Sequence, residues 1–182
     1  MYADDKELLR QFNQTDTKEQ AFTAIIQKYQ EKLYWYVRRV VVVHDDANDV
    51  LQNVFIKVWN GLNKFREDSH LYTWLYRIAT NESLSFLEKL KRSGTISLDE
   101  EGSEGLSNRL KADSHFDEKK LEWRLQLAIQ HLPERQRLVF NLRYYDEMPY
   151  QDMSRMLETS EGSLKASYHH AARKIEEFIK NY

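Results

Sequence analysis

FREDSHLYTWLYRIATNESLSFL, residues 65–87, is the stretch that decides the fold. Its apolar residues recur at helical spacing and predict the buried face of a long helix; they are Leu71, Trp74, Leu75, Ile78 and Ala79. Thr73, Arg77 and Asn81, four residues apart, predict a polar stripe beside the aromatic rings of this stretch, which are Tyr72, Trp74, Tyr76 and Phe86. Exposed rings beside arginine and asparagine suit unstacked bases, because a ring offers a stacking face, an amide reads a base edge and a guanidinium holds phosphate. A core helix with a solvated face explains the same pattern.

The length and composition of the chain limit the classes of function that it can have. The 182 residues suffice for one domain or two small ones. The 27 basic and 29 acidic residues leave a net charge of −2, which argues against a general polyanion binder coated in positive charge. A nucleic-acid function must therefore rest on local patches or on a partner. The sequence has no cysteine, which excludes a disulfide framework, a thiolate zinc site and a cysteine nucleophile.

The same composition predicts compartment and fold class. No apolar run approaches the ~20 residues that a membrane span needs, and the N-terminus, MYADDKELLRQF, does not read as a signal peptide. We therefore expect a soluble cytoplasmic protein without membrane insertion. Two prolines and five glycines are few, and 31% of the residues are charged. This composition predicts an all-α fold.

An acidic segment, residues 93–117, divides the chain into two helical units. It holds three of the five glycines and, with two basic against six acidic side chains, a net charge of −4. It shows little helical periodicity, and its composition is typical of a flexible linker. We therefore predict two small helical domains joined by this linker: an N-terminal helical bundle at 1–92 and a C-terminal helix-turn-helix bundle at 118–182.

The N-terminal unit is predicted to contain four helices, at about 4–13, 17–43, 45–62 and 71–92. Asp45 or Asp46 is expected to cap the third helix, whose apolar residues repeat at three and four positions. The opposite face of that helix displays Asp49, Gln52 and Asn53.

The C-terminal unit ends in a predicted helix-turn-helix. A short helix at 150–157, a polar turn and a longer helix from Glu161 make this arrangement, although many helical hairpins look alike. Ser160 is a good N-cap for the longer helix, and Pro133 suits the first turn of an earlier one. The inward face would be Leu164, Tyr168, Ala171, Ile175 and Phe178. The outward stripe, where a recognition helix meets the major groove, would be Glu161, Lys165, His169 and Arg173.

The sequence contains no motif typical of a metal site or of an enzyme active site. Of the six histidines, His169 and His170 are adjacent, so they point ~100° apart on a helix and do not readily ligate one ion. The others lack the spacing of a zinc-binding histidine motif, and no phosphate-binding glycine loop or nucleophile elbow occurs. We therefore predict no metal, no cofactor, no catalytic residue and no enzyme.

Two blocks of the chain resemble a known family. Residues 45–81, DDANDVLQNVFIKVWNGLNKFREDSHLYTWLYRIATN, resemble the second conserved region of bacterial RNA polymerase sigma factors of the extracytoplasmic-function (ECF) group. Residues 132–171, LPERQRLVFNLRYYDEMPYQDMSRMLETSEGSLKASYHHA, resemble the fourth region. The resemblance implies a transcription initiation factor that binds core RNA polymerase, through the β′ clamp coiled coil and the β subunit, and promoter DNA. As is common in the family, an anti-sigma factor is a further expected partner.

The resemblance also implies roles for individual residues. Docking on the β′ coiled coil corresponds to polar or partly buried residues of one helix: Asp49, Gln52, Asn53, Phe55 and Trp59. Capture of a flipped base of the −10 element corresponds to the loop and helix that carry Phe65, Arg66, Trp74, Arg77 and Asn81. Reading of the −35 element corresponds to the outward stripe of Glu161, Lys165, His169 and Arg173. The acidic segment resembles the one that passes through the polymerase cleft.

The chain departs from the family pattern at Asn53, where an acidic residue is frequent. Its recognition helix also has fewer basic residues, which predicts weaker intrinsic DNA affinity and a smaller salt dependence. Two other functions fit parts of the pattern. One is a conventional helix-turn-helix regulator that binds duplex DNA as a homodimer, and the other is a helical interaction adaptor without a DNA role.

Overall fold

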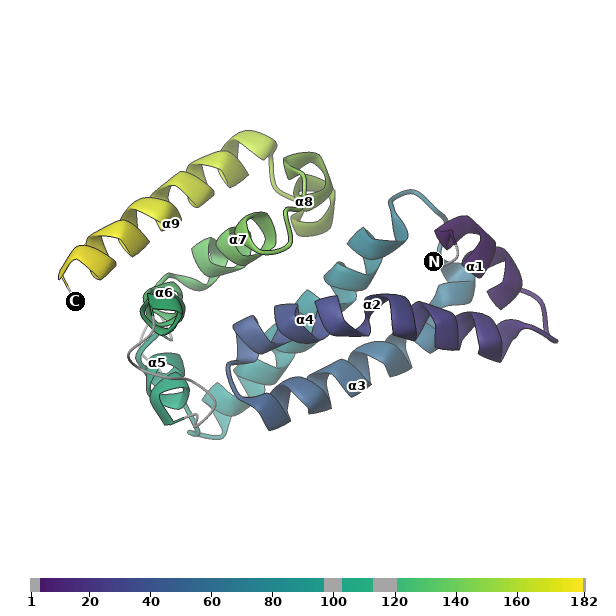
Figure 1. The fold of residues 1–182 in the computed structure, drawn as a ribbon, viewed down its shortest axis with the longest axis horizontal. Helices are drawn as coiled ribbons and strands as arrows, with labels where there is room; N and C mark the ends of the chain where they lie inside the picture. The colour runs from purple at the N-terminus through teal and green to yellow at the C-terminus, as the bar shows by residue number, and fades with distance from the viewer. Residues whose placement is uncertain (1–3, 97–102, 113–120, 182) are drawn as a thin grey trace.

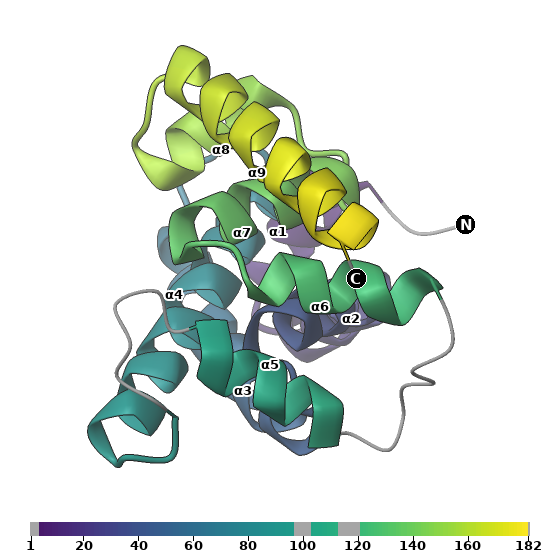
Figure 2. The ribbon, with the colours of Figure 1, turned by 90° about the vertical axis from the view of Figure 1, so that its left-hand side faces the viewer.

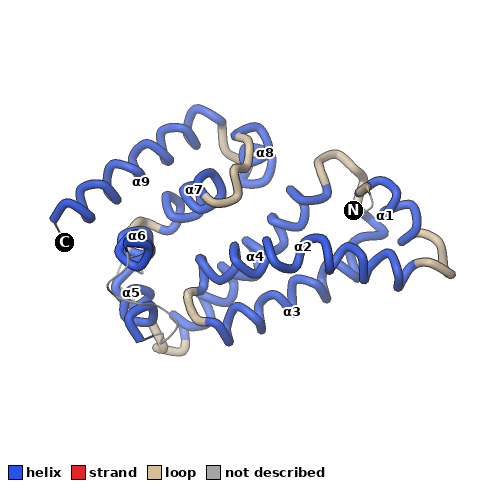
Figure 3. Tube along the Cα trace, viewed as in Figure 1, coloured by secondary structure: helices blue, strands red, loops and turns tan. Residues whose placement is uncertain are grey.

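The computed structural model describes residues 4–96, 103–112 and 121–181, and all regular structure in these ranges is helical (Figure 3). The α-helices are α1 (Asp5–Phe12), α2 (Lys18–Val41), α3 (His44–Gly61), α4 (Leu71–Arg92), α5 (Ser103–Ala112), α6 (Leu121–Gln130), α7 (Glu134–Tyr144), α8 (Tyr150–Leu157) and α9 (Glu161–Asn181). A short 3-10 helix, η1 (Leu62–Lys64), follows α3. The predicted all-α fold is confirmed. No described helix is long and apolar enough to cross a lipid bilayer.

Helix α2 is central to the N-terminal unit, and α1, α3 and α4 pack around it (Figure 1). Its apolar side chains recur every three to four residues, so one face is buried along the helix. Its fully buried members include Ile25, Leu33, Val37 and Val40. The core is completed by side chains of α3 and α4: Val54, Val58, Leu75 and Ala79.

Helix α3 begins one residue earlier than predicted. Val43 occupies the N-cap position and makes no side-chain cap, so the prediction that Asp45 or Asp46 caps this helix is wrong. Both carboxylates lie in the first turn instead. There they stabilise the helix through the positive end of its dipole rather than through a capping hydrogen bond.

The C-terminal unit is built on α9, which packs against α6, α7 and α8. The predicted cap is confirmed, because Ser160 Oγ accepts a hydrogen bond from the N–H of Ser163 at 3.2 Å. Pro133 takes the N-cap position of α7 rather than its first turn. The predicted inward residues of α9 are all buried or half-buried: Leu164, Tyr168, Ala171, Ile175 and Phe178. Helices α8 and α9 therefore form the helix-turn-helix expected from the sequence.

The acidic segment differs from its prediction as a linker without helical periodicity. Part of it forms α5, in which Leu106 and Leu110 are buried. The Arg109 guanidinium donates a hydrogen bond to the Asp46 carboxylate, and this ion pair joins α5 to α3. An apolar face of two leucines one turn apart is too short to be read as a helix in isolation, and neighbouring helices stabilise it by covering it. The parts of the predicted linker that lie outside the described residues are 97–102 and 113–117.

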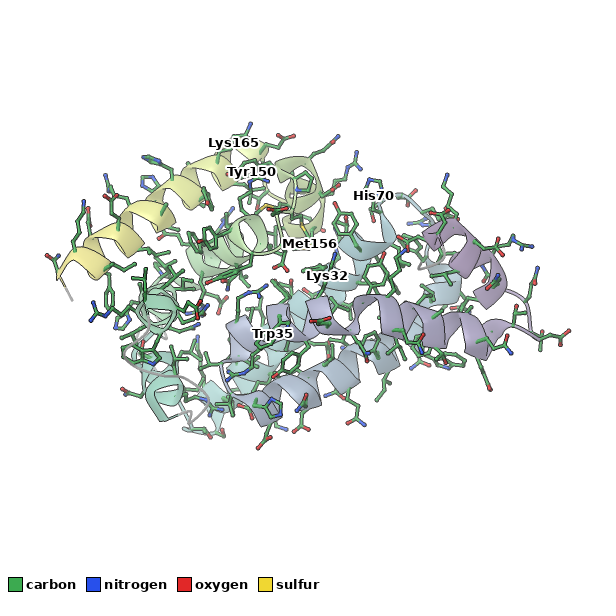
Figure 4. The ribbon with its side chains drawn as sticks, in the orientation of Figure 1. Lys32, Trp35, His70, Tyr150, Met156 and Lys165 are labelled. Carbon is green, nitrogen blue, oxygen red and sulfur yellow. The ribbon has the colours of Figure 1, made fainter. Side chains whose placement is uncertain are left out.

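The two units pack directly against each other. Helix α4 lies beside α8, and α2 beside α7 (Figures 1 and 2). Apolar packing runs through this contact, because Met148, Met153 and Met156 are buried in the same cluster as Leu71 and Leu75. Figure 4 shows Met156 between α8 and the N-terminal helices. The contact of α2 and α4 with α7, α8 and the loop between them is termed the interdomain seam.

Candidate nucleic-acid and protein interfaces

The outward face of α3 carries the residues predicted to dock on polymerase. Asp49, Gln52 and Asn53 are exposed, so these three polar side chains are available to a partner. Phe55 and Trp59 are half-buried, which agrees with their assignment partly to the core. Their rings sit in an aromatic cluster that joins α3 to the start of the chain.

That aromatic cluster has well-defined geometry. The Trp59 ring lies 4.9 Å from the Phe22 ring and 5.4 Å from the Phe12 ring, both edge-to-face. Lys18 Nζ stands 4.7 Å from the Trp59 centroid, a cation–π distance. Trp59 is therefore half-buried in a rigid setting, and little side-chain entropy would be lost when a partner bound it.

Sequence reasoning missed Ile56 on this face. It is 52% exposed, and helical spacing places it among Asp49, Gln52 and Asn53. An exposed isoleucine amid polar side chains is a candidate apolar contact for a partner helix. The signal was present in the sequence, because Ile56 falls outside the buried repeat of Val50, Val54 and Val58.

The structure brings four of the five predicted −10 residues around one cavity. Phe65, Arg66, Trp74 and Arg77 line a hollow of about 230 Å³ beside Asp68. The rings of Phe65 and Trp74 are 5.3 Å apart and inclined at 43°. Arg66 is exposed and pairs loosely with Asp68 at 3.6 Å. Two rings and two guanidinium groups around one hollow suit a stacked base with its phosphate.

Asn81, the fifth predicted residue, does not line that cavity. It is exposed on α4, one turn beyond Arg77. The predicted polar stripe also begins later than expected, because Thr73 is 3% exposed and belongs to the core. Tyr76, expected among the exposed rings, is likewise buried. Both side chains face other helices, which periodicity within α4 alone does not reveal.

The buried Tyr76 belongs to a polar network at the interdomain seam. Its hydroxyl donates to Asp146 Oδ1 at 2.8 Å, and Arg39 Nη2 donates to Asp146 Oδ2 at 2.8 Å. Burial raises the pKa of the Asp146 carboxyl above its ordinary value, although Arg39 and Tyr76 act in the opposite direction. Burial, together with Asp146, raises the pKa of Tyr76, so its hydroxyl remains a donor at neutral pH.

Two further hydrogen bonds join α4 to α8 across the interdomain seam. The Tyr72 hydroxyl donates to the Asp152 carboxylate on α8, and the Arg77 guanidinium donates to the backbone carbonyl of Arg155. Burial and then Asp152 raise the pKa of Tyr72 to about 12. Arg77, a predicted −10 residue, is therefore engaged by the helix-turn-helix in this arrangement.

The predicted −35 stripe lies along the outside of α9. All four members are exposed: Glu161, Lys165, His169 and Arg173. Lys165 pairs with Glu161 at 3.8 Å and Arg173 with Glu177 at 3.8 Å, both one turn apart. Exposed pairs of this kind are worth at most about 1 kcal/mol, so both cations remain available to phosphate.

Tyr150, at the start of α8, is a neighbour of this stripe that sequence reasoning did not single out. Lys165 Nζ lies 5.6 Å from its ring centroid and Arg143 Cζ lies 5.2 Å from it. Figure 4 shows Lys165 extending from the outer side of α9, close to Tyr150. Tyr150 of α8 thus lies near a cation from α7, Arg143, and a cation from α9, Lys165. No three histidine, aspartate or glutamate side chains gather as a metal site within the described residues.

Comparison with known proteins identifies both units. Residues 25–93 match the Sigma-70 region 2 family model, and residues 122–175 match the Sigma-70, region 4 model. The ECF RNA polymerase sigma-E factor of Escherichia coli (strain K12) is 30% identical over 184 residues, covering 97% of this chain and 94% of that protein. The RNA polymerase sigma-H factor of Pseudomonas aeruginosa is 28% identical over 183 residues, with coverage of 97% and 94%.

Solved structures show the same fold. CnrH in complex with the cytosolic domain of CnrY superposes with a TM-score of 0.70 at 18% identity, covering 97% of each chain. The sigma factor RpoE of Bartonella quintana, in complex with the anti-sigma factor NepR, superposes with a TM-score of 0.68 at 20% identity, covering 87% of this chain and 96% of that one.

The fold and the two matched regions define a sigma factor, a class of transcription factors that are not enzymes. The chain belongs to the ECF group of RNA polymerase sigma factors. It is a transcription initiation factor that directs RNA polymerase to promoters.

Proposed function

We propose that the work of initiation is divided between the two units at residue level. The N-terminal unit, residues 1–92, docks on the β′ clamp coiled coil through the outward face of α3. Exposed Asp49, Gln52 and Asn53 supply polar contacts there, and the half-buried rings of Phe55 and Trp59 supply a rigid apolar edge. The exposed side chain of Ile56 adds an apolar contact at the centre of the same face.

The same unit captures the −10 element at the cavity between η1 and α4. A base flipped from the duplex stacks on Phe65 and Trp74, while Arg66 and Arg77 hold the backbone phosphates. Asn81 reads a base edge one turn further along α4, outside the cavity. The observation that carries this proposal is the convergence of four residues, chosen from the sequence, on one hollow.

The C-terminal unit, residues 118–182, reads the −35 element. Lys165 and Arg173 are placed on the outward stripe of α9, and Glu161 and His169 share that stripe with them. The acidic residues 93–117 connect the units and, apart from α5, act as the linker through the polymerase cleft. The β subunit contacts the factor in the same complex. Catalysis belongs to the polymerase, and the chain contributes no catalytic residue.

An anti-sigma factor holds the free protein until it is needed, as in the NepR complex of the structural neighbour. The protein acts in the cytoplasm, where RNA polymerase is found. Neither the homodimeric regulator nor the interaction adaptor accounts for matches to both sigma-70 regions in one chain.

Transcription with purified core polymerase tests the −10 assignment. We expect Arg66→Ala to reduce open-complex formation roughly tenfold, the effect of losing one good nucleic-acid contact. Arg92→Ala is the matched control, because Arg92 is also exposed and paired within α4, to Glu88, but lies away from the cavity. Permanganate footprinting of the melted strand gives the measurement. Equal promoter opening by both variants would remove Arg66 from the −10 site.

A further inference from the structure

A small cavity lies where the end of α2 meets α5, α6 and the residue that follows α7. It has a volume of about 160 Å³ and is lined by side chains from all four segments, among them Val42, Leu110, Gln130 and Tyr145. Val42, Leu110 and Gln130 are at most 2% exposed, whereas Trp35 of α2, which also lines the cavity, is 50% exposed (Figure 4). The cavity is therefore a mostly enclosed hollow, and Trp35 is the most exposed part of its wall.

Two polar groups of this wall are buried without a hydrogen-bond partner among the described residues. They are the acceptor Gln130 Oε1 and the donor Arg39 Nε. The two residues are neighbours, because Gln130 Nε2 donates to the backbone carbonyl of Arg39 at 3.0 Å. Native proteins pair nearly all of their buried polar groups, since leaving one unpaired lowers stability. A molecule that supplied one donor and one acceptor at this place would satisfy both groups.

The backbone at Val42 is strained where it borders the cavity. Val42 ends α2 with a φ of 78° and a ψ of −43°, and its N–H donates to the carbonyl of Arg38 at 2.9 Å. A β-branched side chain rarely adopts a positive φ, because its Cβ substituents crowd the backbone. Strain of this kind persists only where the surrounding structure fixes it, and it is common at ligand-binding sites. The surrounding helices therefore hold this part of the wall in place.

The size, rings and charge of the cavity select a class of ligand. An apolar cavity of about 150 Å³ accommodates one benzene molecule, so this cavity has room for a single six-membered ring. Trp35 and Tyr145 supply aromatic surface for such a ring, and Leu110 supplies aliphatic surface. None of the described residues that line the cavity is acidic. The Arg39 guanidinium is already paired with Asp146 at 2.8 Å, so a neutral ligand leaves no unpaired charge there.

We propose that this cavity is a small-molecule site for a planar cyclic amide of one ring. The ligand N–H donates to Gln130 Oε1, its carbonyl accepts from Arg39 Nε, and its ring packs against Trp35 and Tyr145. A small molecule fits better than a protein segment, because the two unpartnered groups lie at buried positions of a hollow that holds only one ring. The proposal goes beyond promoter recognition and depends on none of the interfaces assigned above.

Two closely related probes test the proposal in the full-length protein. The probe 2-pyridone is a six-membered ring with adjacent N–H and carbonyl groups, and N-methyl-2-pyridone is the same ring without the donor. So small a molecule should bind with a dissociation constant on the order of 1 mM, measured by chemical-shift titration. The N-methyl compound should bind at least about tenfold more weakly, because Gln130 Oε1 then stays unpaired. Absence of binding by 2-pyridone at about 10 mM, or equal affinity for the two probes, overturns the proposal.

The variant Gln130→Met separates loss of the hydrogen bond from steric exclusion of the added methyl group. Methionine keeps the length of the side chain and removes the acceptor, so the variant should bind the two probes with affinities within about twofold of each other. Steric exclusion would persist in this variant. A preference for 2-pyridone that is as large as in the wild type would therefore contradict the role of Gln130. Far-UV circular dichroism verifies that the variant is folded.

A second variant, Trp35→Ala, removes aromatic surface from the wall at an exposed position that the fold tolerates. We expect its affinity for 2-pyridone to fall at least about tenfold, because the ligand ring loses its contact with the indole. Ile56→Ala is the matched control, because Ile56 is 52% exposed on α3 and does not line the cavity. The control should bind 2-pyridone as the wild type does. Equal affinity of the two variants would place the ligand elsewhere and overturn the proposal.

Discussion

Replacing Asp146 with alanine should cost more stability than any single surface substitution in this protein. The Asp146 and Arg39 side chains are 9% and 12% exposed, and each carboxylate oxygen accepts a bond from a different helix. The substitution leaves the Arg39 guanidinium buried without its counter-charge and the Tyr76 hydroxyl without an acceptor.

The magnitude follows from those two losses. Breaking a buried ion pair from one side costs about 3–5 kcal/mol, and an orphaned buried hydroxyl costs about 1–3 kcal/mol. The two penalties share one site, and parting of the seam lets water reach Arg39, so they do not add in full. We expect the free energy of unfolding to fall by about 3–5 kcal/mol.

Urea unfolding followed by far-UV circular dichroism measures this loss. Glu147→Ala is the control in the same loop, because Glu147 is exposed and its replacement should change stability by less than about 0.5 kcal/mol. An Asp146→Ala variant as stable as the control would mean that Asp146 is solvated in solution. The buried network, and with it the packed seam, would then be refuted.

The pH dependence of Asp146→Asn provides an independent check. Burial raises the pKa of Asp146 above its ordinary 3.8, so the folded state binds this proton more tightly than the unfolded state. The Asp146 carboxyl therefore adds to the free energy of unfolding below pH 3.8. This contribution is lost as the pH rises through the raised pKa of the folded state. As the pH falls through this window, the wild type should gain stability relative to Asp146→Asn. A constant difference across acidic pH would contradict the assignment.

Other predictions concern the proposed interfaces and one turn. Asp49→Ala with Gln52→Ala should weaken binding to core polymerase in a pull-down while the melting temperature stays nearly unchanged, since both side chains are exposed; unaltered affinity would exclude this face. Asn81→Ala should cost about 1–3 kcal/mol in open-complex formation by permanganate footprinting, with duplex −35 binding intact; full opening would make Asn81 an ordinary solvated residue. Lys165→Ala should lower −35-dependent transcription and reduce the salt slope of binding by about one; an unchanged slope argues against a phosphate contact. Glu158→Gly should raise stability by about 0.5–1 kcal/mol in urea, because Glu158 ends α8 with a φ of 52° that glycine adopts without strain; a loss would show that the Glu158 side chain stabilises the turn.

The sequence alone determined the bounds of those helices whose apolar residues recur regularly, and the inward face of α9. Apolar residues at 3.6-residue spacing predicted the bounds of α4 and α8 as observed, and Ser160 predicted the start of α9. These features depend on interactions between residues three or four apart, which periodicity and capping preferences report directly. The outward stripe of α9 could be predicted for the same reason, since residues opposite the buried face of a helix are exposed.

Tertiary structure decided which of the remaining faces are covered. Thr73 and Tyr76 were expected on a polar, partly aromatic surface, and both are buried. Leu106 and Leu110 were assigned to a linker and are the buried side of α5. The physical reason is common to all four. Their burial depends on segments distant in the chain, as when Asp146 meets Tyr76 across 70 positions, and such pairings leave no periodic trace in either segment.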